Sequence, residues 1–370
     1  MGQIISLPGL IDIHTHLRTP GQENKEDFLT GTSAALAGGF TTILDMPNNK
    51  IPITTQVLLA EKIELARQSS VCDIGFHFGS LGDNLEEFEK VTAGHPERSE
   101  GSLVFGLKLY LNPTTGNFLI DRAKLKSIYQ SWPGNQPILL HCEGETMPMA
   151  LKVIKETGKK THICHVSSKE ELSAIIEAKK AGLPITCGAT PHHLFLTEED
   201  AKTLGAYGHM KPFLKTQADV DFLWQNLENI DIIESDHAPH TKEEKDSDNP
   251  PFGVPGLETT LPLLLTAVSE GKLKLEDIER LCHKNPARIF NIPTSPDTKV
   301  LVDLDEEYEI KNQQAVSFGN ENLKTKCGWS PFNGKKVKGK VKQVYLRGEK
   351  VFENGKILAK EGSGKVIYPT

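Results

Sequence analysis

Several features that would assign this 370-residue chain to a specialised class are missing from its sequence. No apolar run approaches the roughly 20 residues that a transmembrane helix needs, and no basic segment followed by an apolar one opens the chain. The net charge of −7 argues against nucleic acid or an anionic membrane as the main partner. We therefore expect a soluble protein that binds neither a membrane nor a nucleic acid.

The cysteine pattern also excludes some classes. The six cysteines form no C-x-x-C pair, and several lie within apolar runs, as buried reduced thiols do in cytosolic proteins. This usage predicts a cytoplasmic location. The first apolar run is not followed by a G-x-G-x-x-G motif, so a dinucleotide-binding fold is not indicated.

Short apolar runs alternate with helical patterns along most of the chain. The runs that we predict as strands are residues 4–16, 40–46, 71–79, 103–111, 137–142, 162–166, 185–189 and 230–235. Helices are predicted between most of them, and Ser168 with Glu171 three residues later is typical of a helix N-terminus. Eight strands that alternate with helices favour a parallel (β/α)₈ TIM barrel over an open, doubly wound sheet.

The composition changes near residue 293. The segment 293–370 is rich in lysine, glycine, valine and tyrosine, with short alternating runs such as residues 341–346 between glycine turns. We predict a barrel domain over residues 1–292 and a small, β-rich C-terminal subdomain over residues 293–370 that packs on the barrel.

Several predicted strands carry, near their ends, side chains that suit an apolar core poorly. His14 and His16 stand at i and i+2, so both project to the same side of the first strand. The corresponding residues of later strands are Lys108, His141, His165 and Asp236. Each alone has an ordinary structural explanation, such as a helix cap. Because active sites of parallel barrels lie at the C-terminal ends of the strands, the whole set predicts a site there.

These residue types predict a metal centre, since neutral imidazoles and a carboxylate suit Zn²⁺ or a similar divalent ion. A lysine desolvated beside metals can react with CO₂, and the resulting carbamate can bridge two cations. The bridge is then Lys108, and the two sites are completed by His14, His16 and Asp236 and by His141 and His165. A water between two metals ionises near neutral pH, and Asp236 is the natural general base and acid. We predict hydrolysis of an amide-like bond without an organic cofactor.

Longer motifs carry a resemblance to a known family. They are residues 7–18, 45–49, 106–112 and 235–241, with further matching stretches at 190–196, 255–259 and 331–334. Together they resemble dihydroorotases of the amidohydrolase superfamily, and most of all the dihydroorotase domain of the animal multifunctional pyrimidine-synthesis protein. The resemblance covers essentially the whole chain.

The resemblance implies a small-molecule reaction, the reversible cyclisation of N-carbamoyl-L-aspartate to L-dihydroorotate in pyrimidine synthesis. It further implies a homodimer and is compatible with association with aspartate transcarbamoylase. The planar guanidinium of Arg18 suits the free carboxylate of the substrate, and loop 112–116 resembles a mobile lid. The other matches to the family's substrate contacts are Asn48, Thr114, His240 and Gly253, with Lys211 as a weaker one.

One position departs from the family pattern. The animal-type domain carries a glutamate in its seventh strand that helps to hold a third zinc, together with the cysteine before the sixth-strand histidine. Cys164 is present here, but the glutamate position is Gly188. A third metal is therefore doubtful on the sequence, and we predict two.

Two alternatives remain open. Hydantoinases and allantoinases share the binuclear site but do not need an arginine placed for a ring carboxylate, so Arg18, Asn48 and His240 together argue against them. Some fungal relatives keep a dihydroorotase-like domain as an inactive structural module. Such a module should have lost metal ligands, and all six are present here.

Overall fold

Two parallel sheets form the central part of the computed structural model, which describes residues 2–93, 101–116, 118–313 and 323–370. One sheet contains β2 (Leu10–Thr15), β3 (Phe40–Asp45) and β4 (Asp73–Phe76). The other contains, in order, β5 (Phe78–Gly79), β6 (Leu107–Tyr110), β7 (Ile138–His141), β8 (Thr161–Ile163), β9 (Ile185–Ala189) and β10 (Ile232–Ile233).

Two junctions close these sheets into a ring. At the first, only His77 separates β4 from β5, so the two are one interrupted strand that joins both sheets. At the second, His237 just beyond β10 forms a parallel bridge with Thr15 of β2, and its carbonyl accepts the backbone N–H of His16 at 2.8 Å. The eight parallel strands of the predicted TIM barrel are therefore present, and the barrel is closed.

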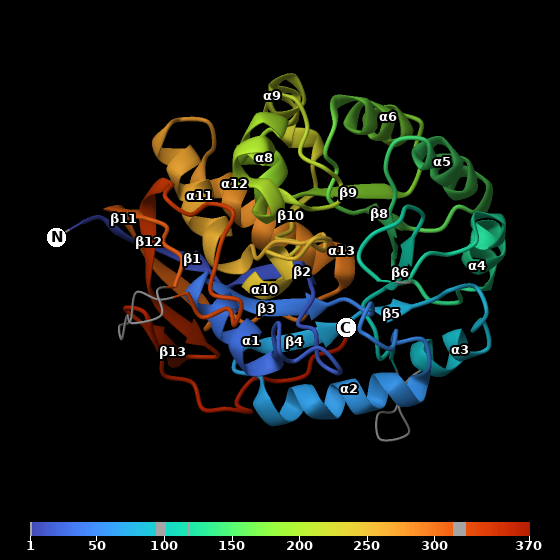
Figure 1. Cartoon of the computed structure of the whole chain (residues 1–370). Helices are drawn as coiled ribbons and strands as arrows, with labels where there is room; N and C mark the ends of the chain where they lie inside the picture. Colours follow the sequence, from blue (N-terminus) through green and yellow to red (C-terminus); the bar gives the residue numbers. More distant parts are fainter. Residues whose placement is uncertain (1, 94–100, 117, 314–322) are drawn as a thin grey trace.

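Helices surround the barrel (Figure 1). The longer ones are α1 (Phe28–Ala37), α2 (Gln56–Ser69), α5 (Thr146–Thr157), α6 (Lys169–Lys180), α9 (Gln217–Gln225) and α11 (Leu257–Ser269). The shorter ones are α3 (Glu87–Thr92), α4 (Leu125–Ser131), α7 (Pro191–Phe195), α8 (Glu198–Leu204), α10 (Lys242–Lys245), α12 (Leu275–Glu279) and α13 (Asn285–Phe290). None of the helices in the described ranges is long and apolar enough to cross a membrane.

The ends of the helices show which local predictions succeeded. The capping box of α6 is confirmed, because the Ser168 side chain accepts the backbone N–H of Glu171 and the Glu171 side chain reaches back to Ser168. Helix α5 was not predicted. Its Pro148 interrupts a helical pattern in sequence, but it lies in the first turn, where a missing N–H does little harm.

The first predicted strand, residues 4–16, is wrong as a single element. Its first part is β1 (Ile4–Pro8), which leaves the barrel and pairs antiparallel with β11 (Lys299–Glu309). The break is at Gly9, where a Cβ atom would lie 2.2 Å from the Thr41 Oγ1. Only glycine fits this close approach, and the uninterrupted apolar pattern hid the change of sheet.

An antiparallel sheet stands beside the barrel, as Figure 1 shows around β11–β13. Its order is β1-β11-β12-β13-β14, with β12 (Lys336–Leu346), β13 (Glu349–Glu353) and β14 (Lys356–Ile357). This sheet is the small C-terminal β unit expected from the sequence, although residues 314–322 lie outside the described ranges. The boundary at residues 292 and 293 stays a prediction.

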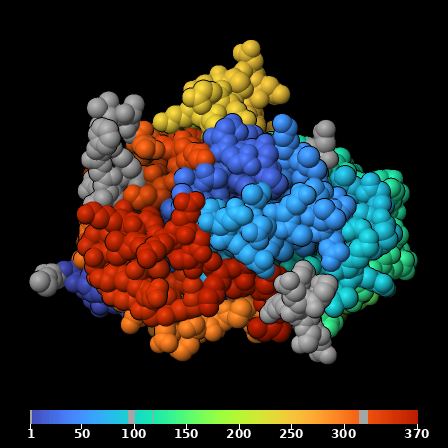
Figure 2. All heavy atoms as spheres, turned by 90° about the horizontal axis from the view of Figure 1, so that it is seen from below, coloured from blue at the N-terminus to red at the C-terminus, as the bar shows by residue number. Residues whose placement is uncertain are grey.

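The last residues return to the barrel. The backbone N–H of Gly364 donates to Ser70 O at 2.9 Å, and that of Ile367 donates to Ile74 O at 2.8 Å. In Figure 2 the red C-terminal residues accordingly lie against the light-blue region that contains α2. The tail thereby connects the C-terminal sheet to the strands that carry the beginning of the barrel.

The apolar core has two main parts that bear on the barrel. The larger cluster fills the space between strands and helices. A smaller one joins Ile11 and Ile13 of β2 with Leu139 of β7, Ile232 of β10 and Phe290 of α13. Because β2 and β7 are not neighbours, this second cluster lies inside the barrel. Polar side chains can therefore occupy the C-terminal ends of the strands, above this apolar layer.

Candidate active site

A pocket opens at the C-terminal ends of the barrel strands. The predicted site residues that line it are His14, His16, Arg18, Asn48, Thr114, His141, His165, Asp236 and Gly253. Two further predicted residues, Lys108 and His240, are completely buried and are not part of this lining. The weaker match Lys211 lines the pocket as well.

His14 of β2 and His16, just beyond this strand, converge on one carboxylate. The Nε2 of His14 lies 3.2 Å from Oδ1 of Asp236, and the Nε2 of His16 lies 3.0 Å from the same oxygen. The two imidazole centroids are 5.3 Å apart. The three side chains predicted to hold one metal are therefore next to one another.

The other ring nitrogen of each histidine has an oxygen partner. The Nδ1 of His16 lies 2.6 Å from Oδ1 of Asn48, and the Nδ1 of His14 lies 3.2 Å from Oε2 of Glu234. These oxygens are acceptors, so they favour the tautomer with the proton on Nδ1, which leaves the Nε2 lone pair for a cation. A neutral imidazole fixed in this way is the usual form of a metal-binding histidine.

His141 and His165 form the other half of the site. The Nδ1 of His141 lies 3.0 Å from Nε2 of His165, and the ring centroids are 4.6 Å apart. Among the described residues, the buried Nδ1 of His165 has no hydrogen-bond partner, and the buried Nε2 of His141 has only the Glu143 carboxylate at 3.7 Å. Buried polar atoms are seldom left unpaired, so the donor set fits a cation that these imidazoles would hold.

Lys108 is a fully buried lysine close to both halves. Its Nζ lies 3.1 Å from the Sγ of Cys164 and 4.8 Å from the centroid of the Tyr110 ring. No carboxylate of the described residues forms an ion pair with it, and a buried charge without a counter-ion is unfavourable. Conversion of the amine to a carbamate beside cations would remove this unpaired positive charge. The carboxylated form stays a prediction.

The protonation states in the pocket suit metal binding and proton transfer. Burial, with the charges of Lys108 and Arg18, lowers the pKa values of His14 and His16 well below the usual range. Burial likewise lowers the pKa of His165. These imidazoles are therefore neutral at pH 7. Burial raises the pKa of Asp236 to about 7, against the opposing charge of Lys108, so this carboxyl can exchange a proton near neutral pH.

Three site residues have strained backbones. Arg18, His165 and Asp236 have φ angles of 65°, 40° and 44°, in the left-handed region. They account for three of the six non-glycine residues with positive φ in the described part of the chain. This conformation costs about 1–2 kcal/mol for a residue with a side chain, and such strain gathers at functional sites. The strand ends are thus held in place by their surroundings.

Arg18 is a buried cation at the edge of the pocket. Its Nε donates to Pro239 O at 3.1 Å, and its Nη2 lies 3.2 Å from Nε2 of His240. His240 also lies 3.0 Å from Phe252 O, which places it behind Arg18. A direct contact of His240 with a substrate stays a prediction.

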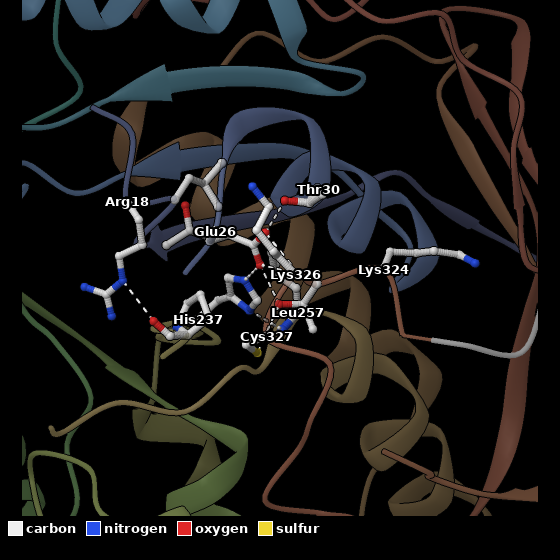
Figure 3. A network of polar contacts seen from close by, with 12 residues as sticks. Arg18, Glu26, Thr30, His237, Leu257, Lys324, Lys326 and Cys327 are labelled. Carbon is white, nitrogen blue, oxygen red and sulfur yellow. Dashed lines mark hydrogen bonds and ion pairs between the residues drawn. The ribbon is translucent and has the colours of Figure 1, made fainter. Parts of the chain in front are cut away.

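A network of polar contacts supports the strand end that carries Asp236 (Figure 3). The next residue, His237, lies 3.3 Å from Oε2 of Glu26 through Nε2, and its Nδ1 accepts the backbone N–H of Gly256 at 3.2 Å. Glu26 also accepts the Thr325 hydroxyl and the backbone N–H of Lys326. The segment between β11 and β12 of the C-terminal sheet is thereby anchored to the active-site end of the barrel.

Sequence reasoning missed Glu234, which is fully buried beside His14. A signal was present, because a glutamate that interrupts an apolar strand, directly after Ile232 and Ile233, is unusual. At Gly188 the sequence indicated that a carboxylate of the related domains is missing. A Cβ atom there would lie 2.5 Å from Oε1 of Glu234, so a carboxylate from the neighbouring strand occupies that space.

Four pocket-lining residues were also missed. They are Tyr110, Thr115, Ala238 and Phe252. The Thr115 hydroxyl donates to Phe252 O at 2.8 Å and accepts the Phe252 N–H at 2.9 Å, which joins the loop after β6 to the loop after β10. Nothing in the sequence pattern reveals such a contact between distant loops.

Comparisons with known proteins show which family the chain resembles. The profile of the Amidohydrolase family matches residues 5–351. The chain is 43% identical over 367 residues to the multifunctional protein CAD of Squalus acanthias, a match that covers 99% of this chain and 16% of that protein. The chain thus spans about a sixth of the length of this relative.

Two further comparisons involve proteins of similar size. The dihydroorotase of Pyrococcus abyssi is 37% identical over 391 residues, which cover 99% of this chain and 88% of that protein. The solved structure of L-hydantoinase from Arthrobacter aurescens superposes with a TM-score of 0.89 at 26% identity, over 98% of this chain and 89% of that one. The chain therefore belongs to the amidohydrolase family, in which its near-full-length relatives include dihydroorotases.

Proposed function

We propose that the chain is a dihydroorotase, which interconverts L-dihydroorotate and N-carbamoyl-L-aspartate with the help of two divalent metal ions. The observation that carries the substrate assignment is the buried, unpaired guanidinium of Arg18 in the same pocket as His14, His16, His141, His165 and Asp236. The match to an archaeal dihydroorotase over almost its whole length supports the same activity.

Arg18 is only 6% exposed, and no carboxylate of the described residues forms an ion pair with it. Its direct contacts are the neutral Pro239 carbonyl and His240. The carboxylates of Asp236, Asp45 and Glu244 act on its charge without forming an ion pair. A buried cation in this state favours an anionic ligand. The free carboxylate of dihydroorotate, bound through a bidentate pair of hydrogen bonds, meets this need, whereas the hydantoin and allantoin rings carry no carboxylate.

The predicted metal ligands are His14, His16, His141, His165, Asp236 and carboxylated Lys108. When bound, the metal pair would polarise the amide carbonyl and make a water acidic near neutral pH. Asp236 faces His14 and His16, and its pKa in the metal-free protein is about 7. It is placed to take a proton from the attacking water and to give one to the leaving nitrogen in hydrolysis, and the reverse in cyclisation.

Other pocket residues orient the substrate in this proposal. Gly253 lets the backbone approach closely, since its φ is 136° and a Cβ would lie 2.5 Å from Ala238 O. Thr114 lines the pocket from the loop after β6. Asn48 also lines it and already holds His16 through Oδ1, which leaves its amide NH₂ for a substrate oxygen.

An assay of ring hydrolysis tests the proposal. The purified protein, loaded with Zn²⁺, should hydrolyse L-dihydroorotate and should form it from N-carbamoyl-L-aspartate. Hydantoin and allantoin, assayed in parallel, should react much more slowly because they leave Arg18 without an anionic partner. Faster turnover of hydantoin than of dihydroorotate would favour the hydantoinase alternative, and no turnover with any of the three would favour an inactive structural module.

The surroundings of the enzyme are also part of the proposal. All six cysteines are free and buried, which supports a cytoplasmic location. We expect a homodimer, and the resemblance to part of CAD is compatible with association with aspartate transcarbamoylase. Light scattering of the purified protein measures the first of these, and co-elution with the transcarbamoylase tests the second.

A further inference from the structure

Glu234 is a completely buried glutamate next to the candidate metal centre, and neither the predicted ligands nor the predicted substrate contacts include it. It follows β10 directly and precedes Ser235 and Asp236. A carboxylate is seldom buried completely, because its charged form loses hydration. The partners of Glu234 inside the protein therefore have to explain its position.

The Glu234 carboxylate contacts residues from two other barrel strands. Its Oε2 lies 3.2 Å from Nδ1 of His14, at the end of β2, and 3.6 Å from Nε2 of His162 in β8. Its Oε1 accepts the backbone N–H of His165, a residue with a left-handed φ of 40°. Two of these three partners are predicted metal ligands, and they come from the two halves of the site.

The space for this carboxylate is provided by Gly188 in the neighbouring strand. The two strands run parallel, with Gly188 opposite Ile232, and the Glu234 N–H donates to Ala189 O at 3.0 Å. A Cβ atom at Gly188 would lie 2.5 Å from Oε1 and 2.7 Å from Cδ of Glu234, closer than real contacts allow. Because Gly188 in β9 has no side chain, the Glu234 carboxylate fits into this space.

We propose that Glu234 is a positioning residue of the metal centre, an inference that rests on the proposed function. By accepting the Nδ1 proton of His14, it leaves Nε2, the nitrogen that faces Asp236, as the ligand atom. By accepting the backbone N–H of His165, it also fixes the backbone that carries the His165 imidazole, a predicted ligand of the other metal. Asn48 has the first of these roles for His16.

The test compares Glu234→Gln with Glu258→Gln in the Co²⁺-loaded protein. Glu258 is a matched control, because it also accepts backbone N–H groups, from Lys324 and Thr325, and no contact joins it to a predicted metal ligand in the described residues. We expect Glu234→Gln to weaken Co²⁺ binding roughly 10–100-fold, to alter the visible spectrum of bound Co²⁺ and to lower kcat more than it changes KM. Glu258→Gln should match the wild type in all three. Unchanged Co²⁺ affinity and spectrum in Glu234→Gln would overturn the proposal.

A double variant tests the complementarity of Gly188 and Glu234. Glu234→Ala removes the carboxylate, and Gly188→Asp in the same chain supplies another from β9. The double variant should bind Co²⁺ about tenfold more tightly than Glu234→Ala alone, because the new carboxylate from β9 again orients His14. A double variant with a native circular dichroism spectrum and no gain in affinity would count against the proposal.

Glu234 could instead bind a third metal ion directly, because His14, Cys164 and Glu234 offer ligand atoms within 4.8 Å of one another. The number of metal ions bound per chain distinguishes this direct ligation from a positioning role. Two Co²⁺ ions per chain at saturation, in the wild type and in Glu234→Gln, support positioning. Three ions in the wild type and two in Glu234→Gln would show that Glu234 is a metal ligand, and this result would overturn the positioning proposal. The Co²⁺ measurements need no substrate. Weakened binding in Glu234→Gln, with a wild type inactive on dihydroorotate, would refute the proposed substrate and still support the role of Glu234.

Discussion

The barrel strands and the strands of the C-terminal sheet bury their side chains differently. Every residue of β2, β3, β6 and β7 is buried, whereas buried and exposed positions mix along β11 and β12. A parallel barrel is covered by helices outside and by its own side chains inside, while an antiparallel sheet can keep one face in water. Charged residues therefore have different meanings in the two regions.

In the C-terminal sheet a charged residue is ordinary. Lys340 and Lys342 both pair with Glu306 across β11 and β12, at 2.8 and 2.9 Å, with about a third of each side chain exposed. In the barrel strands, the charged Lys108 is completely buried and has no such partner in the described residues. A polar residue inside a barrel strand is consequently a much stronger indication of function than one in the sheet.

The largest effect that this comparison predicts is on Lys108. Lys108→Ala should abolish dihydroorotate hydrolysis, because it removes the proposed bridge between two cations, and the metal content should fall below two per chain. A short carboxylic acid such as acetate should restore part of the activity by replacing the carbamate. Lys340→Ala in the sheet is the control, with activity and metal content expected at wild-type values. Full activity of Lys108→Ala would contradict the proposed metal centre.

A smaller effect is expected at Arg18. Arg18→Ala removes a charged partner of the substrate carboxylate, a type of hydrogen bond worth about 1.5–3 kcal/mol, so kcat/KM for dihydroorotate should fall roughly 10–100-fold. Arg18→Lys should recover only a small part, since an ammonium lacks the planar bidentate geometry. Steady-state kinetics measure both variants. An Arg18→Ala enzyme with unchanged kcat/KM would show that the substrate assignment is wrong.

A third, smaller effect is expected on the pH dependence of metal binding by the barrel. The carboxyl of Asp236 has a pKa of about 7, so below pH 7 an incoming cation has to displace its proton. Displacement of the Asp236 proton should therefore contribute a fall in the Co²⁺ affinity of the metal-free protein of about tenfold per pH unit below 7 and none above it, in addition to the protons that carboxylation of Lys108 releases. His14, His16 and His165 add no slope near pH 7, because burial lowers their pKa values well below 6.5.

Titration of Co²⁺ into the wild type and Asp236→Asn at pH 8, 7 and 6 isolates this contribution. Below pH 7 the slope of Asp236→Asn should be smaller than that of the wild type by about tenfold per pH unit, and equal slopes would show that Asp236 does not release the proton.

The smallest effect on activity is expected in the C-terminal sheet. Leu346 of β12 is 3% exposed, so Leu346→Ala should lower the free energy of unfolding by about 2–5 kcal/mol while kcat stays unchanged at temperatures where the protein is folded. Lys342→Ala, on the more exposed side, should cost less than about 1 kcal/mol. Denaturant unfolding compares the two. A large loss of kcat in Leu346→Ala would show that the sheet and the active site act as one unit.

The sequence predicted the barrel because strand and helix patterns alternate regularly, and periodicity is a local property. It also predicted which side chains share the pocket. His14, His141 and Asp236 all end strands, and parallel topology brings such ends together whatever their separation in sequence. These predictions needed only the order of elements and the direction of the strands.

Features that depend on contacts between particular side chains could not be predicted. Gly188 suggested a missing carboxylate, but the position of Glu234 in the same space is set by the register of β9 and β10. The departure of β1 from the barrel depends on the close approach of Gly9 to Thr41. Likewise, His240 turned out to lie behind Arg18 because Phe252 O and Glu244 hold it there.

The pairing of β1 with β11 has a consequence for how the chain folds. The strand β1 has its partner almost three hundred residues later in the sequence, with Ile4 opposite Asp303. Until that partner emerges, β1 is an open strand edge, and such edges attract other chains. A fragment ending before β11 would keep every predicted metal ligand and still expose this edge. Solubility of the barrel therefore depends on a strand that contributes nothing to its chemistry.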